Sequence, residues 1–145
     1  TLIIRDPFYV SCEDNEDNLK ANQVETLIIH NPPNSHLKEL LTFAPNIKKL
    51  IVRGKCNDRF GQLEPRKFKD ILILLPKLEE FVFCGKMKID NEILALIAQS
   101  KLRRITIEYQ YDIYDEVARA CEKLKSAHPQ MMVMSSVISS YYSWL

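Results

Sequence analysis

The stretch Leu78-Glu79-Glu80-Phe81-Val82-Phe83-Cys84-Gly85 decides the fold, because its pattern recurs along the chain. Each copy reads apolar, two mostly polar residues, apolar, any residue, apolar. Apolar residues at alternate positions indicate a short strand with one buried face, and recurrence at a near-constant period indicates stacked units. The three other full copies are Val24–Asn31, Ile47–Gly54 and Leu102–Tyr109.

Two further copies extend the series in both directions. Thr1–Pro7 mirrors Thr26–Pro32, and Met131–Met134 gives a sixth, poorer match. The anchoring apolar residues are Leu2, Leu27, Leu50, Phe81 and Ile105, separated by 25, 23, 31 and 24 residues. A period this regular is typical of a solenoid, in which each unit packs mainly on its neighbours.

Apolar residues at helical spacing fill the segments between the strands. They predict helices over His36–Ala44, Arg66–Leu75, Asn91–Gln99 and Tyr114–Ala127. Asp90 stands at the N-cap position of the third of these helices, where a carboxylate can accept hydrogen bonds from the free backbone amides of the first turn. Prolines end three of the helices just before the next strand, namely Pro45, Pro76 and Pro129.

Alternating strands and helices suit either a doubly wound sheet or a solenoid. Doubly wound strands are apolar throughout, because helices cover both faces of the sheet. Here charged pairs interrupt the pattern, so one face is solvated; the pairs are Lys48-Lys49, Glu79-Glu80 and Arg103-Arg104. We therefore predict one α/β domain over residues 1–145, a short solenoid of strand-helix units with a parallel sheet on its concave face.

The repeat resembles the leucine-rich repeat, specifically the helix-containing type of F-box/leucine-rich-repeat proteins. The residues that carry the resemblance are Pro45–Val52, Pro76–Phe83 and Leu102–Ile107, within a likeness that covers most of residues 1 to 130. It implies a non-enzymatic module that binds a protein, as the substrate receptor of an SCF-type ubiquitin ligase or as an assembly scaffold. The family's asparagine or cysteine after each strand is replaced, which predicts a degenerate variant; the replacements are Pro32, Lys55, Lys86 and Gln110.

Composition and motif spacing limit the other classes of function. The chain has 20 Lys plus Arg against 19 Asp plus Glu, a balance that argues against a dedicated nucleic-acid or membrane-surface protein. Basic residues gather between Lys48 and Lys69, but acidic residues elsewhere in the chain balance them, so we read this cluster as a solvated face. Three glycines are too few for a glycine-rich phosphate loop. The acidic stretch Glu13–Asn18 lacks the glycine and distal glutamate of a calcium loop, so we expect a connecting loop there.

No catalytic, cofactor-binding or metal-binding residues are predicted. None of the histidines, His30, His36 and His128, stands at a recognised motif spacing from a nucleophile or a carboxylate. The four cysteines show no metal-ligand spacing, and their density is below that of disulfide scaffolds, so we expect reduced thiols. With neither a secretory signal nor an apolar membrane span, the sequence predicts an intracellular protein, cytoplasmic or nuclear. Because the first residue is Thr1, we read the chain as a fragment of a longer protein.

The face of the sheet that does not meet the helices is the strongest functional signal. Alternate strand residues point to opposite faces, so stacking the copies places one row of mostly aliphatic residues between two flanking rows of mixed charge. An exposed apolar row of this kind marks an interaction surface. We predict a protein-binding site at Ile28, His30, Lys49, Ile51, Arg53, Glu80, Val82, Arg104, Thr106 and Glu108.

Two hypotheses remain beside this one. Residues 128–145 read as a C-terminal cap over the exposed core, or as a binding tail whose Ser143-Trp144-Leu145 resembles a PDZ ligand if Leu145 is a natural terminus. The second hypothesis assigns a different class of function: the chain is an α/β enzyme or a nucleotide-binding domain. Its site would lie beyond the carboxyl ends of the strands, at a topological switch point.

Overall fold

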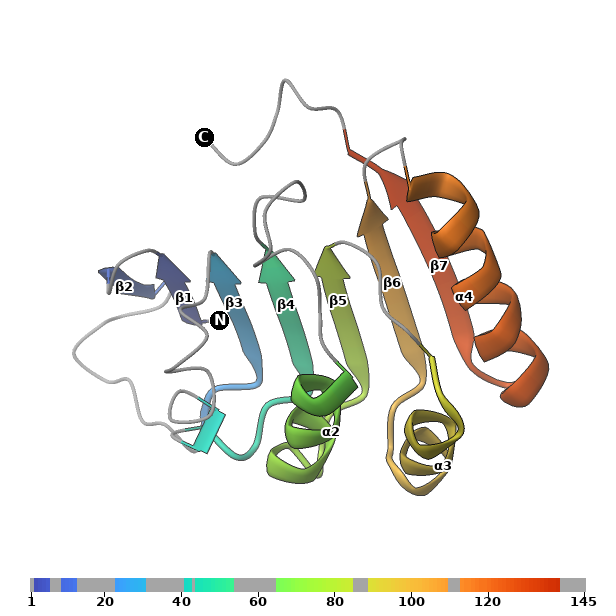
Figure 1. Ribbon diagram of the computed structural model, residues 1–145. Helices are drawn as coiled ribbons and strands as arrows, with labels where there is room; N and C mark the ends of the chain where they lie inside the picture. The colour runs from blue at the N-terminus through green and yellow to red at the C-terminus, as the bar shows by residue number, and fades with distance from the viewer. Residues whose placement is uncertain are drawn as a thin grey trace.

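The computed structural model describes residues 2–5, 9–12, 23–30, 41–42, 44–53, 65–84, 89–109 and 113–138. In these residues, seven strands form one sheet in the order β2-β1-β3-β4-β5-β6-β7, accompanied by three helices (Figure 1). The strands are β1 Leu2–Arg5, β2 Tyr9–Cys12, β3 Thr26–His30, β4 Lys49–Arg53, β5 Glu80–Cys84, β6 Arg104–Tyr109 and β7 Met132–Val137. The helices are α2 Pro65–Leu74, α3 Asn91–Gln99 and α4 Tyr114–Ala127. The predicted α/β class and parallel sheet are confirmed.

All strands except β2 run parallel, and each pairs with the next parallel strand in the chain. The register matches the alignment of the repeats, with Ile28 opposite Ile51, Ile51 opposite Val82, and Val82 opposite Thr106. Matching repeat positions therefore form straight rows across the sheet.

Strand β2 was not predicted. It pairs antiparallel with β1, with Arg5 opposite Tyr9 and Leu2 opposite Cys12, and forms one edge of the sheet. Its four residues, Tyr-Val-Ser-Cys, do not carry the repeat that identified β1, a strand of the same length.

The two polar residues of each repeat mark where the chain joins the sheet. At each junction, two consecutive backbone amides donate to one carbonyl oxygen of the preceding unit, at 2.7 to 3.1 Å. The same arrangement recurs three times, as Lys48 and Lys49 on Glu25, Glu79 and Glu80 on Lys48, and Arg103 and Arg104 on Glu79. The repeat is therefore visible in the backbone hydrogen bonds as well as in the sequence.

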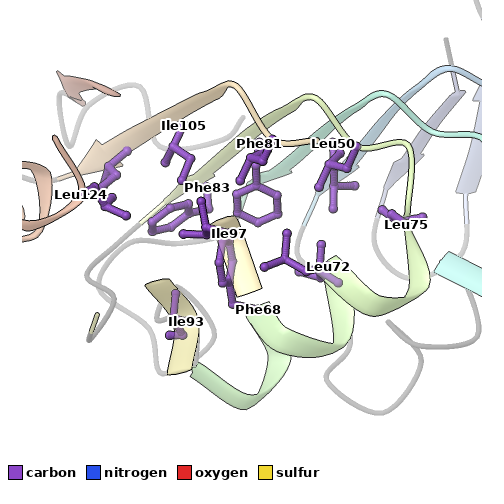
Figure 2. Packing of buried hydrophobic residues seen from close by; sticks show 14 of the residues in the cluster. Leu50, Phe68, Leu72, Leu75, Phe81, Phe83, Ile93, Ile97, Ile105 and Leu124 are labelled. Atoms are coloured by element: carbon purple, nitrogen blue, oxygen red, sulfur yellow. The ribbon is translucent and has the colours of Figure 1, made fainter. Parts of the chain in front are cut away.

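One face of the sheet packs against the helices through an apolar core. Phe68 of α2 meets Phe81 of β5 edge-on, with ring centroids 5.5 Å apart, and Phe83 lies 5.4 Å from Phe81 (Figure 2). All three are essentially inaccessible to solvent. Leu50 and Ile105 continue this layer on the neighbouring strands, and no polar side chain is buried among the described residues.

Helices α2 and α3 are joined by charged groups at the start of α3. The Asp90 carboxylate accepts a hydrogen bond of 2.7 Å from the Ile93 amide, which confirms the predicted N-cap. This bond, together with the nearby Lys69 ammonium, lowers the pKa of Asp90. Lys69 donates to Glu92 at 2.6 Å, and this bond raises the pKa of Lys69.

Some predictions fall outside the described residues. These include most of the helix His36–Ala44, of which Leu41 and Thr42 are helical, and the positions Pro32, Lys55, Lys86 and Gln110. Residues 139–145, with the expected PDZ-like end, are not described either. In the part of the chain that is described, no helix combines the length and apolar character needed to cross a membrane.

We predict that Phe81→Ala lowers the free energy of unfolding by about 3–5 kcal/mol, because it leaves a cavity beside Phe68 and Phe83. Ile73→Ala is the matched control, since Ile73 is 67% exposed on α2 and its loss should change stability by less than about 0.5 kcal/mol. Denaturant titration measures both. A loss below about 1 kcal/mol for Phe81→Ala would contradict the packing described here.

Candidate functional site

The candidate site is the sheet face opposite the helices, which we call the outward face. In β3 the exposure alternates, with Leu27 and Ile29 buried in the core while Thr26, Ile28 and His30 are partly exposed. The register carries this alternation to the neighbouring strands. All ten sequence-predicted partner residues therefore lie on the outward face, in three adjacent rows.

The first row crosses the amino-terminal ends of the strands and is held by ion pairs. Glu80 on β5 lies between Lys49 on β4, at 3.6 Å, and Arg104 on β6, at 3.7 Å. A second line of charges runs beside it at the strand starts, where Lys48 pairs with Glu25 at 3.6 Å and Arg103 with Glu79 at 3.3 Å. Positive and negative groups thus alternate from strand to strand, an arrangement that favours this register over a slipped one.

These charges surround a hollow of about 490 Å³, which we call the amino-terminal hollow. Four cations and two carboxylates line it, together with one amide and one thioether. The lining residues are Lys48, Lys49, Arg103, Arg104, Glu79, Glu80, Gln130 and Met132. The hollow therefore combines an excess of positive charge with one apolar wall.

The central row departs from the sequence prediction. Ile28, Ile51, Val82 and Thr106 are contiguous as predicted, but Ile51 and Val82 are each only 8% exposed. The expected accessible strip is therefore wrong at its two central positions. Each of these side chains has neighbours on both adjacent strands, so little of its surface reaches solvent. Neither belongs to the helix-side core.

The third row crosses the carboxyl-terminal ends of the strands. Arg53 Nε lies 3.3 Å from Glu108 Oε1, so this pair joins β4 to β6 across β5. In register, the residue between them is Cys84, which is 5% exposed and disulfide-bonded. The expectation of reduced thiols is therefore wrong for Cys84, because sequence spacing does not show which cysteines the sheet brings together.

The other described thiol belongs to Cys121 on α4, which is free and buried. Burial raises the pKa of Cys121, and the Lys125 ammonium opposes this shift. This agrees with its predicted place on the apolar stripe of that helix. Cys121 is therefore an inert core residue rather than a reactive one.

Strand β7 adds two site residues that the sequence did not single out. Met132 and Met134 stand opposite Arg104 and Thr106, on the outward face, and are 50% and 49% exposed. They continue the first and central rows. Alignment of the sixth copy, Met131–Met134, with the preceding copy places both methionines in these rows and could have identified them.

The described histidines and acidic groups form no reactive cluster. The His128 ring lies with Nε2 3.0 Å from the Leu94 carbonyl oxygen and so links the C-terminal end of α4 to the middle of α3. Within the described ranges, no group of three or more His, Cys, Asp or Glu residues could hold a metal ion.

Comparison of the chain with protein-family models, with curated proteins and with solved structures finds no match. The resemblance to leucine-rich repeats therefore stays a prediction from the residues.

We predict that peptide mapping without reduction recovers the Cys84 peptide in a cross-link and the Cys121 peptide as a free thiol. In the folded protein, Cys121 should react with iodoacetamide far more slowly than after denaturation, because the thiol is buried and its raised pKa disfavours the thiolate. Mass spectrometry of timed alkylations measures both. Rapid alkylation of Cys84 in the unreduced, folded protein would contradict the disulfide.

Proposed function

We propose that this chain is a non-enzymatic protein-protein interaction module, a short α/β solenoid that binds a protein partner on its outward face. The observation that carries the proposal is the composition of this face. The helices pack on the other side of the sheet, while the outward face presents paired charges beside two half-exposed methionines.

Three features support a solenoid rather than a doubly wound sheet. The parallel strands follow one another in chain order, the register aligns equivalent repeat positions, and the same backbone hydrogen bonds recur at the starts of β4, β5 and β6. Each unit thus packs mainly on its neighbours in the chain, as in repeat proteins. The resemblance to F-box/leucine-rich-repeat proteins extends the proposal to a substrate receptor or an assembly scaffold, with the outward face as the surface that binds the partner.

The chemistry of the outward face is that of a protein interface. Such interfaces combine an apolar centre with a polar rim, and methionine is frequent in them because its flexible thioether adapts to different partners. Here Met132 and Met134 give the apolar part, and the ion pairs of the first row give the polar part. Those pairs also fix the positions of long side chains before a partner arrives, which lowers the entropy lost on binding.

The enzyme hypothesis requires a topological switch point, where the order of parallel strands reverses and ligand can enter between the loops. The described parallel strands, β1 and β3 to β7, show no such reversal. We therefore give the sheet face preference over the carboxyl ends of the strands.

We predict that a photo-crosslinking residue at Met134 captures partners several-fold more efficiently than the same residue at Ile73. Both positions are exposed, at 49% and 67%, but Met134 lies on the outward face and Ile73 on α2. The measurement compares the yield of discrete cross-linked species from cell lysate by mass spectrometry, after circular dichroism shows that both variants fold. Equal or higher yield from the Ile73 position would overturn the proposed face.

A further inference from the structure

The amino-terminal hollow has an uneven distribution of charge. Its four cations face two carboxylates, and a third carboxylate, Glu25, pairs with Lys48 from outside the lining. On the β4 side, Lys48 pairs with Glu25 beside β3, and Lys49 pairs with Glu80 of β5. On the β6 side, the carboxylates that pair with Arg103 and Arg104 among the described residues are Glu79 and Glu80, both on the side of β5.

The alternation of charge stops at β7. Arg104 stands opposite Met132 in the register, and the other β7-side residue of the lining is the neutral Gln130. The described segment that contains β7, residues 128–138, has no acidic residue, so the two lines of charge end at Arg103 and Arg104 within the described sheet. Their side chains are 75% and 46% exposed, against 40% and 23% for Glu79 and Glu80. At the β6 side of the hollow, the arginine side chains are therefore more accessible to a ligand than the glutamates that pair with them.

The two guanidinium groups retain donors for a ligand. A guanidinium carries five N–H donors, and each of these groups contacts one carboxylate of β5. Arg103 Nη2 lies 3.3 Å from Glu79, whereas Arg104 Nη1 lies 3.7 Å from Glu80, a distance that leaves room for a better acceptor. Planar carboxylates match this fork of donors in bidentate geometry.

We infer that Arg103 and Arg104 bind a carboxylate side chain of the partner, and that Met132 and Met134 receive an apolar side chain next to it. The occupant is thus an acidic segment of a protein in which Asp or Glu alternates with large apolar residues. The two arginines favour an acidic segment over a basic one, because opposite charges attract. The two methionines favour a segment that also has apolar residues over a purely acidic one. The inference rests on the proposed function, because it assigns partner chemistry to one end of the same face.

The experiment measures dissociation constants by fluorescence anisotropy for three synthetic peptides. One alternates Glu with Leu, the second replaces Glu with Lys, and the third replaces Leu with Ser. We expect the unmodified chain to bind the Glu-Leu peptide at least about tenfold more tightly than the Lys-Leu peptide, with affinity that falls as salt rises. Equal binding of the two peptides, or no binding of the Glu-Leu peptide, overturns the inference.

Variants locate the contact. Arg103→Gln with Arg104→Gln should weaken Glu-Leu binding by about tenfold or more, because charged hydrogen bonds are lost. The matched control is Arg66→Gln, which removes an exposed cation from α2 and should leave the affinity unchanged. Met132→Ser with Met134→Ser should weaken the Glu-Leu peptide but not the Glu-Ser peptide. Equal loss from the Arg66 variant, or an unchanged affinity of the double arginine variant, overturns the inference.

The two proposals fail separately. If the Met134 position gives cross-links but the Arg103 and Arg104 substitutions leave peptide affinity unchanged, the interaction face is retained and the acidic partner is rejected. Crosslinks chiefly from Ile73 would reject the face itself, whatever the peptides show. Thermal unfolding of each variant confirms that a loss of binding is not a loss of fold.

Discussion

Burial of alternate strand residues against a single layer of helices is the constraint on which the rest of the structure depends. Leu50, Phe81 and Ile105 occupy the same position in successive strands and are fully buried. A slip of one residue would turn Lys49 or Glu80 toward this apolar layer, where an unpaired charge is strongly unfavourable. The register is therefore fixed from the helix side, and the rows on the outward face follow from it.

The polar pairs in each repeat then have two structural consequences. Their backbone amides share one carbonyl of the preceding unit, so the chain joins the sheet in the same way at β4, β5 and β6. Their side chains alternate in sign across β4, β5 and β6, so β5 has an oppositely charged neighbour on each side at its start. Exposed ion pairs add little to stability, but like charges would meet if the order of strands changed. We infer that these residues specify which strands are neighbours more than how strongly they hold together.

Much of this arrangement could be predicted from the sequence, because it depends on periodicity. The three described helices and the parallel register follow from apolar spacing, which the core enforces. Strand β2 could not be predicted, because Tyr-Val-Ser-Cys does not carry the repeat that identified β1, a strand of the same length. The burial of Ile51 and Val82 could not be predicted either, because exposure depends on how many strands flank a position. The disulfide of Cys84 depends on distances in space, which spacing in the sequence does not contain.

The position of a strand in the sheet also explains why the candidate site lies at one end of the outward face. Ile51 and Val82 have strands on both sides and are 8% exposed, whereas Met132 and Met134 on the terminal strand of the described sheet are about half exposed. The same position in the repeat is therefore closed in the middle of the sheet and open at β7. Side chains of a partner placed beside β7 would cover the two methionines much as the flanking strands cover Ile51. A partner bound there would occupy the place of a further strand of the sheet. An acidic side chain of that partner would continue the alternation of charge beyond Arg103 and Arg104.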